Sequence, residues 1–302
     1  MAASTTINSQ RSGRHYPGAA ILAALLVCLL WSYWPTIADL RAFWAVNEDY
    51  SVGQLVPFVA VYLAWRCCRR VEFGALRPCW WGLAVIGVAQ AGRFFGVYFF
   101  YVSIERYCLV LAIAGVVLLV LGAAMFRRLL WVLVFLLLMV PLPRQVHEAV
   151  SLPLQTVASA SAAFVLEMLG FVIVREGNAL RLDDQAVVAV TEACNGLRML
   201  TAFVFVAAVL AFLIRRPPWQ RATILASSIP IAIVTNAIRL VVTSVCVAVT
   251  GDASIDEMVH NYAGLAMMPV AVLALAGELW LLPRLTHMSV SRGAELAGSR
   301  AG

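Results

Sequence analysis

Long apolar runs, each close to the length needed to cross a lipid bilayer, follow one another along this 302-residue chain. A helix needs about 20 apolar residues to span the hydrocarbon core. The chain is 63% hydrophobic and only 13% charged, with a mean hydropathy of +0.89, whereas a soluble domain is about half apolar and about a quarter charged. Because so few polar residues cannot coat a water-soluble globule, we expect an all-α polytopic membrane protein.

Eight apolar runs are candidates for transmembrane helices. They cover residues 19–38, 51–66, 79–100, 107–125, 129–142, 197–214, 222–248 and 262–282. The third run contains Arg93, which is expected to snorkel toward the headgroups or to mark the end of that span. The first run lacks a small-residue cleavage site, so we interpret it as a retained anchor rather than a signal peptide.

The distribution of Arg predicts the orientation, because cytoplasmic loops carry an excess of positive charge. All 22 basic residues are Arg. With the N-terminus in the cytoplasm, the inside segments hold 14 of them and the outside segments hold 6, while Arg93 and Arg239 lie within spans. The net charge of +6 therefore indicates membrane orientation rather than nucleic-acid binding, and residues 283–302 form a cytoplasmic tail.

The longest outside segment, residues 143–196, is expected to form a small periplasmic insertion of a helix and a β-hairpin. Its helical part, residues 145–169, is dotted with polar side chains. If this part crossed the membrane, the Arg-rich loops after it would lie outside, so we expect it to lie in the interface or to re-enter. Two extended runs flank Gly177-Asn178 and predict a hairpin, with residues 187–190 as a candidate third strand. No second soluble domain is indicated, so residues 1–302 are treated as one domain.

Cys194 is a candidate nucleophile because it immediately precedes the sixth span, whose N-terminal end points outward. Free N–H groups and the positive end of the helix dipole favour a thiolate there, and the thiolate is the nucleophilic form. The alternative interpretation is a small buried hydrophobic residue, as we assume for the other six cysteines. None of the seven forms a CxxC pair, so neither a zinc site nor a disulfide framework is indicated, and no cofactor is expected.

Arg239 and His260 are predicted to lie near the same membrane face as Cys194. Arg239 falls roughly 10 Å short of the outer end of the seventh span. An Arg at that depth indicates a functional site, although snorkelling beside Asn236 fits its position equally well. His260 precedes the eighth span, which also begins outside; a lone interfacial His is more often a solvated polar residue. An imidazole can exchange a proton with a thiol, and a guanidinium can stabilise an oxyanion.

Four further residues are candidate supporting groups, and they are Glu192, Asn195, Arg198 and Asn236. Glu192 is expected to orient His260 or bind substrate, or else to be a solvated loop residue. Arg198, one turn after the cysteine, is expected either to aid the thiolate or to contact headgroups.

Three blocks of sequence resemble the signature of the exosortase/archaeosortase family. They read Thr191-Glu-Ala-Cys194-Asn-Gly-Leu-Arg198, Asn236-Ala-Ile-Arg239 and His260-Asn-Tyr-Ala-Gly264. Residues 48–57, 134–143, 153–155 and 177–180 also resemble the family, so the resemblance covers nearly the whole chain beyond the first helix. Each block alone is weak, but their order and spacing are specific. Asn195 and the Ser51-Val52-Gly53 stretch depart from the common pattern and mark a subtype.

The resemblance implies a multi-pass enzyme of the bacterial cytoplasmic (inner) membrane with a periplasmic active face and with Cys194, Arg239 and His260 as catalytic residues. Such an enzyme is a cysteine transpeptidase or protease that cleaves C-terminal PEP-CTERM-like sorting signals of exported proteins through a thioester acyl-enzyme. Each signal consists of a motif, an apolar helix and an Arg cluster. The implied partners are these exported proteins, the lipid bilayer and exopolysaccharide machinery, with a link to surface anchoring.

Three alternatives stay open at this point. They are a non-catalytic assembly factor for exopolysaccharide export, a transporter, and a protease that cleaves without transfer. The absence of an inverted repeat in the sequence argues against a transporter, and the intact Cys, Arg and His favour chemistry over scaffolding. The sequence does not separate transfer from hydrolysis.

Overall fold

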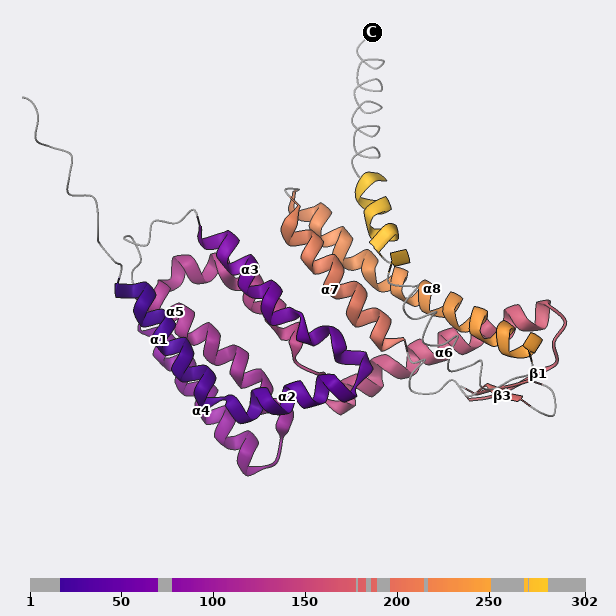
Figure 1. Cartoon of the computed structure of the whole chain (residues 1–302), viewed down its shortest axis with the longest axis horizontal. Helices are drawn as coiled ribbons and strands as arrows, with labels where there is room; N and C mark the ends of the chain where they lie inside the picture. Colours follow the sequence, from indigo (N-terminus) through magenta and orange to yellow (C-terminus); the bar gives the residue numbers. More distant parts are fainter. Residues whose placement is uncertain are drawn as a thin grey trace, which may run out of the picture. The chain divides into compact units, whose positions relative to one another are not determined.

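The structure is a computed structural model that describes most of the chain (Figure 1). The described residues are 17–69, 78–177, 179–182, 186–188, 196–214, 217–250, 269–270 and 272–281. Their contacts divide the chain into two compact units. The first comprises Met1–Ala42 and Ala60–Val140, and the second comprises Phe43–Val59 and Pro141–Gly302.

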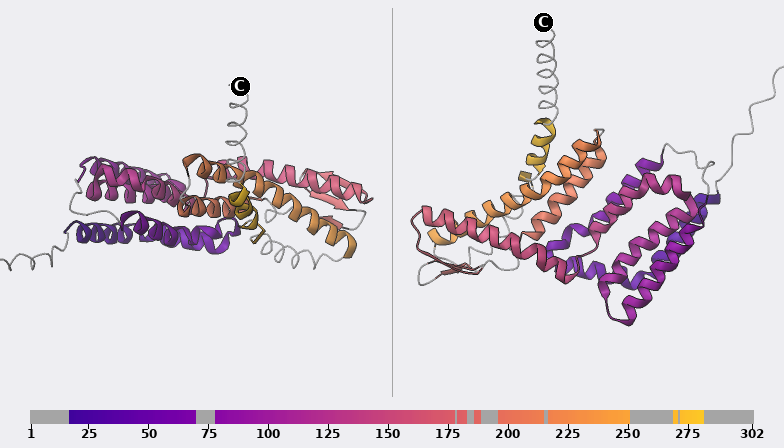
Figure 2. Two further views of the ribbon diagram at one scale, coloured as in Figure 1. Left: turned by 90° about the horizontal axis from the view of Figure 1, so that it is seen from above. Right: turned by 180° about the vertical axis from the view of Figure 1, so that it is seen from behind.

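The first unit is built around two helices that lie side by side, α4 (Trp81–Tyr98) and α5 (Val102–Leu136), as the two views of Figure 2 also show. Small residues bring their backbones close together. A Cβ added at Gly82 would lie only 2.4 Å from the backbone nitrogen of Leu119. Such close approach through glycine is typical of helix pairs in membranes.

Helix α5 is broken at Gly122, where φ is 76° and ψ is 174°. Glycine adopts this conformation because it has no Cβ to clash with the backbone. The predicted runs 107–125 and 129–142 therefore fall on one kinked helix, followed by the short 3-10 helix η3 (Leu137–Met139). The break lies inside the first of these two runs rather than between them.

A bent pair of helices, α1 (Pro17–Ser32) and α2 (Trp34–Val46), precedes this hairpin, and α1 packs against α5. The bend measures 67°. Arg93 of α4 donates hydrogen bonds to the hydroxyl of Ser32 at 2.9 Å and to its carbonyl oxygen at 2.7 Å. Its guanidinium also lies 4.3 Å from the ring centroid of Tyr33. The last carbonyls of a helix lack intrahelical donors, so Arg93 stabilises the end of α1, and its position relative to the headgroups stays a prediction.

Arg106 of α5 attaches α2 to the hairpin, and we predict that its loss destabilises the first unit. It is 7% exposed and donates to one carboxylate oxygen of Asp39 from Nε at 3.1 Å and from Nη2 at 2.8 Å. Arg106→Ala should lower the free energy of unfolding by about 1–3 kcal/mol. This is less than for a fully buried pair, because the Asp39 side chain is half exposed.

Thermal unfolding of the detergent-solubilised chain measures this effect. The matched variants are Asp39→Ala and the double substitution. Because the two side chains act as a pair, the double variant should lose little more stability than the worse single variant. Fully additive losses would show that the pair contributes nothing.

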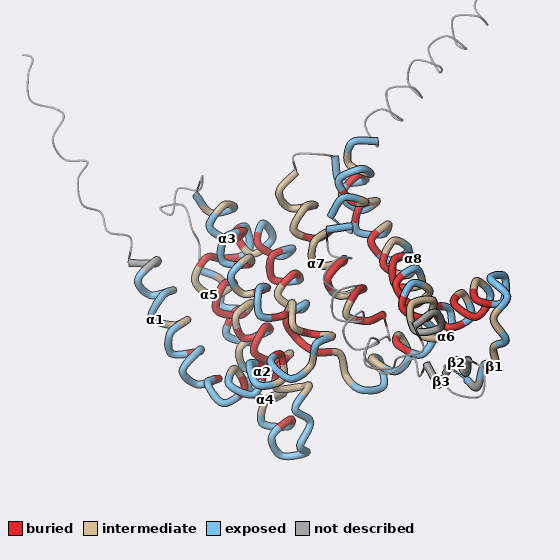
Figure 3. Tube along the Cα trace, turned by 45° about the vertical axis from the view of Figure 1, so that its right-hand side comes forward, coloured by how far each residue is buried: buried red, intermediate tan, exposed pale blue. Residues whose placement is uncertain are grey.

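The second unit consists mainly of three helices, α6 (Arg144–Met168), α7 (Leu197–Leu213) and α8 (Pro218–Thr250). Helix α8 packs against both α6 and α7, and the buried stretches of α7 and α8 stand out in Figure 3. The 3-10 helix η1 (Glu48–Gln54) contacts α7. Helix α3 (Val56–Cys68) follows η1 along the chain. Its residues up to Val59 belong to the second unit, and its residues from Ala60 on belong to the first.

A three-stranded antiparallel sheet follows α6, formed by β1 (Ile173–Glu176), β2 (Ala179–Leu182) and β3 (Ala186–Val188) in the order β1-β2-β3. Gly177, with φ at +66°, lies between β1 and β2. The predicted hairpin is therefore confirmed. The third strand is present as Ala186–Val188, whereas residues 189–190 of the predicted strand lie outside the described residues. The sheet buries Leu180 in a cluster with alanines of α6 and Leu240 of α8, which anchors the insertion to the helices.

Helix α6 turns into this sheet through a glycine in the left-handed region. Gly170 has φ at +89°, and its N–H donates to the carbonyl of Glu167 while the N–H of Phe171 donates to that of Leu166. These two bonds satisfy carbonyls that the helix end leaves without donors. The chain therefore reverses sharply after α6 and begins β1.

Four of the described helices are long and apolar enough to cross a membrane, and the bent α1–α2 pair is a fifth if it is one span. The four are Glu48–Cys68, Val102–Met139, Arg144–Met168 and Pro218–Cys246. Leu197–Leu213 and Val272–Leu281 are shorter apolar helices. The described part of the chain thus confirms a helical, multi-pass membrane protein but not the count of eight. Helix α6 passes this test of length and composition, although the charge bias favours an interfacial or re-entrant position.

Candidate functional site

Only part of the predicted site lies within the described residues. Arg239, Asn236 and Arg198 are described, whereas Cys194, His260, Glu192 and Asn195 lie outside the described residues. The described part of the site is therefore one face of α8 and the first turn of α7. The convergence of Cys194, Arg239 and His260 stays a prediction.

Arg239 lies on a buried polar face of α8. Its side chain is 2% exposed, and it is the largest fully buried side chain of the described residues. This burial excludes snorkelling to the membrane interface. The other buried polar residues of this face recur at helical spacing, and they are Ser228, Thr235, Asn236 and Thr243. A guanidinium inside a helix long enough to cross a membrane is costly and indicates a functional site.

The backbone just after Cys194 contacts this face. Gly196 precedes α7 with φ at +76°, in the left-handed region. A Cβ at Gly196 would lie 2.8 Å from Nδ2 and 3.1 Å from Cγ of Asn236, so the position needs glycine both for its conformation and for space. Two residue lengths separate Cys194 from Gly196, which limits their Cα separation to about 7 Å. Asn236 in turn lies one helical turn before Arg239.

The first turn of α7 is also bonded to η1. Arg198 donates from Nη1 to the carboxylate of Glu48, and the hydroxyl of Thr201 donates to the backbone carbonyl of Asp49 at 2.7 Å. In the structure, Arg198 therefore pairs with a carboxylate, and its predicted roles toward the thiolate or the headgroups stay predictions. These contacts hold the start of α7, and with it the chain next to Cys194, against η1.

A second imidazole in this unit had no role in the sequence-based prediction. The hydroxyl of Tyr50 in η1 lies 3.0 Å from Nδ1 of His147 in α6, and Tyr50 is 7% exposed. The two residues are 97 positions apart, so no local pattern could pair them. The available signal was the 48–57 block, which contains Tyr50 and resembles the family.

The sequence profile described as transmembrane exosortase matches residues 44–277. This stretch is more than half of the chain and includes η1, the sheet, α7 and α8. The chain belongs to the transmembrane exosortase family. No curated protein and no solved structure matches it. Family membership supports a membrane sorting transpeptidase in general. In this exosortase, α1 and most of α2 precede the matched residues.

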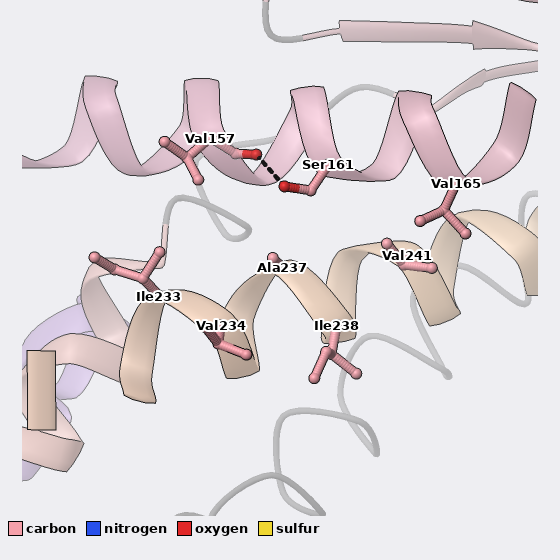
Figure 4. Close-up of a pocket in the computed structure, with 8 residues that line it drawn as sticks. All are labelled: Val157, Ser161, Val165, Ile233, Val234, Ala237, Ile238 and Val241. Atoms are coloured by element: carbon pink, nitrogen blue, oxygen red, sulfur yellow. Dashed lines mark hydrogen bonds between the residues drawn. The ribbon is translucent and has the colours of Figure 1, made fainter. Parts of the chain in front are cut away.

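This exosortase also has an apolar groove of about 380 Å³ between α6 and α8 (Figure 4). It is lined by Val157, Ser161, Val165, Ile233, Val234, Ala237, Ile238 and Val241. The one hydroxyl among these side chains, on Ser161, donates to the carbonyl of Val157 at 2.8 Å. Apart from the Ser161 hydroxyl, the described lining of the groove is apolar and has no titratable side chain. No cluster of three His, Cys, Asp or Glu that could hold a metal ion occurs among the described residues.

Proposed function

We propose that this exosortase is a membrane-embedded cysteine transpeptidase that cleaves C-terminal PEP-CTERM-like sorting signals of exported proteins. Cys194 is the nucleophile, Arg239 stabilises the oxyanion, and His260 exchanges the proton. One observation carries this proposal: the backbone two residues after Cys194 contacts Asn236, one turn from the buried Arg239. Gly196 thus contacts the residue one helical turn from a desolvated cation, and a cation in such surroundings stabilises an oxyanion strongly.

The reaction follows from these three groups. The Cys194 thiolate attacks the scissile carbonyl carbon, and the guanidinium of Arg239 stabilises the oxyanion of the tetrahedral intermediate. The intermediate collapses to a thioester on Cys194 as the C–N bond breaks, and the imidazolium of His260 protonates the leaving amine. An amine or hydroxyl that attacks the thioester gives transfer, whereas water gives hydrolysis.

The substrate's apolar tail lies in the bilayer beside the enzyme's helices, which places the sorting motif at the outer surface. The link to surface anchoring and exopolysaccharide export is part of the proposal and rests on the family resemblance.

We also propose the path of eight spans in the bacterial inner membrane with the active face in the periplasm. The Arg distribution supports the orientation. Helix α4 covers most of the third predicted span, and its 18 residues extend about 27 Å, but it is not among the four described helices that are long and apolar enough to cross a membrane. Exposed aromatic side chains flank it, with Trp80 and Trp81 at its start and Tyr98, Phe99 and Phe100 at its end. Aromatic residues gather at both membrane interfaces in this way.

Co-expression with an exported reporter tests the proposal. The reporter ends in a motif, an apolar helix and an Arg cluster taken from a protein of the same genome. We expect it to lose its tail only when the exosortase is present, and added hydroxylamine should yield a C-terminal hydroxamate, because it intercepts the thioester. A reporter with a scrambled motif and the same helix is the matched control. Correctly inserted reporter that stays full length would contradict the proposal.

A further inference from the structure

His147 is the only histidine among the described residues, and the proposed reaction steps give it no role. Its Nδ1 lies 3.0 Å from the hydroxyl of Tyr50, and the Tyr50 side chain is 7% exposed. The two rings also lie beside each other, with centroids 6.0 Å apart. Losing a hydrogen bond at a buried hydroxyl is costly, so this pair holds the 3-10 helix η1 against α6.

The first turns of α6 depend on this attachment. The side chains that pack α6 on α8 in the buried cluster, and those that line the groove, lie between Val157 and Leu166. From His147 to Val157 is ten residues, or about 15 Å along the helix. The contact with η1 therefore fixes a part of α6 that lies well before its packing on α8.

The same short helix η1 is bonded to the first turns of α7. Arg198 donates to the carboxylate of Glu48. The hydroxyl of Thr201 donates to the backbone carbonyl of Asp49 at 2.7 Å. The next residue, Tyr50, bonds α6, and α7 contacts η1 far more than it contacts α6. Three consecutive residues of η1 thus connect the starts of two helices that touch each other little.

We propose that Tyr50 and His147 are positioning residues: their hydrogen bond holds η1 against α6, and η1 in turn holds the start of α7 in the place that the reaction needs. This role rests on the proposed function, because Cys194 is three residues before α7 begins. Misplacing a reacting group by about 1 Å can cost about 100-fold in rate. Loss of one bond that acts through η1 should cost less, about tenfold. Neither side chain touches the substrate or takes part in the proton transfers.

Kinetics of the detergent-solubilised full chain test this role with a synthetic peptide that reproduces the C-terminal signal of the processed reporter. Tyr50→Phe removes only the hydroxyl and should lower kcat about tenfold while KM stays within about twofold, because positioning acts on the bound substrate. His147→Ala should do the same. His147→Asn, whose amide group is as far from the backbone as Nδ1, should restore most of the rate. In the Tyr50→Phe background the two His147 variants should be equal, because the bond is already lost.

Tyr33→Phe is the matched control. Tyr33 is fully buried, and within the described part of the chain its hydroxyl has no hydrogen-bond partner. It belongs to the first unit and lies outside the residues that the family profile matches. Removing this hydroxyl should therefore leave kcat within about twofold of the wild type.

Hydrogen exchange of the same variants tests whether the bond acts through η1. The N–H of Leu200 bonds to the carbonyl of Gly196 at the start of α7. In Tyr50→Phe, the amides of Leu200 to Phe203 should exchange about fivefold faster, because local opening at this end of α7 becomes easier. The amides of α4 should exchange as in the wild type.

Unchanged kcat in Tyr50→Phe would overturn the role, and so would a lower kcat with unchanged exchange at the start of α7. Equally faster exchange in every helix of the second unit would also overturn it, because the bond would then only support the fold. If the wild type cleaves no peptide, or if Cys194→Ala cleaves normally, the proposed function fails and the positioning role fails with it. Exchange is measured without cleavage, so it still shows whether the bond holds the start of α7, and the two failures stay distinguishable.

Discussion

Cys194→Ala should abolish processing of a co-expressed reporter, with a loss of at least about a thousandfold, while the protein stays in the membrane at the wild-type amount. Alanine has no nucleophile, so no thioester forms, and what remains of catalysis by binding and oxyanion stabilisation is small. Removal of the tail is measured by the change in reporter mass. The covalent enzyme–reporter adduct, which hydroxylamine releases, should disappear as well.

Cys28→Ala is the matched control, because Cys28 is an exposed cysteine of α1 outside the residues that the family profile matches. It should process the reporter at a rate within about twofold of the wild type, as expected for a substitution remote from the site. Complete processing by Cys194→Ala would end the cysteine mechanism, whatever the behaviour of the other residues.

Arg239→Ala should lower kcat about 100–1000-fold, because the oxyanion of the tetrahedral intermediate loses its cation in a site with a low dielectric. The guanidinium is 2% exposed, so the substitution also leaves a cavity on α8 and lowers stability. Thermal unfolding measured on the same preparation separates the two effects. Arg239→Lys keeps the charge but not the planar fork of N–H donors, so it should restore only part of the rate.

Arg93→Ala is the matched control for Arg239→Ala, because Arg93 also lies within an apolar helix. Its bonds to Ser32 stabilise the bend between α1 and α2. We therefore expect a loss of stability with processing within a few-fold of the wild type. Wild-type kcat in Arg239→Ala would contradict the assigned role of Arg239, and an equal loss of kcat in Arg93→Ala would mean that the effect is not specific to the site.

Local sequence patterns were sufficient for several parts of the fold. The apolar runs predicted a helical membrane protein, because the hydrocarbon core sets a minimum length for each helix. The Gly177-Asn178 pair between two extended runs predicted the hairpin of β1 and β2, because glycine adopts the positive φ that the turn needs. The signature blocks around Cys194, Arg239 and His260 predicted the family, which the profile match over residues 44–277 confirms.

Other features depend on how helix faces meet, and no local pattern contains that information. The sequence left Arg239 equally suited to snorkelling and to a functional site; its burial on α8 excludes snorkelling. Tyr50 and His147 lie 97 residues apart, and Arg106 and Asp39 lie 67 apart, yet each pair is in hydrogen-bond contact. The count of spans is also undecided by composition, because Gly122 breaks α5 without interrupting its apolar run.

The sequence by itself therefore determined the class of protein, its family and the candidate residues, because apolar length, turn chemistry and motif spacing are properties of short segments. The tertiary structure alone decided that Gly196 contacts Asn236 one turn from Arg239. That contact arises from the packing of α7 on α8, and packing depends on the shapes of both surfaces at once.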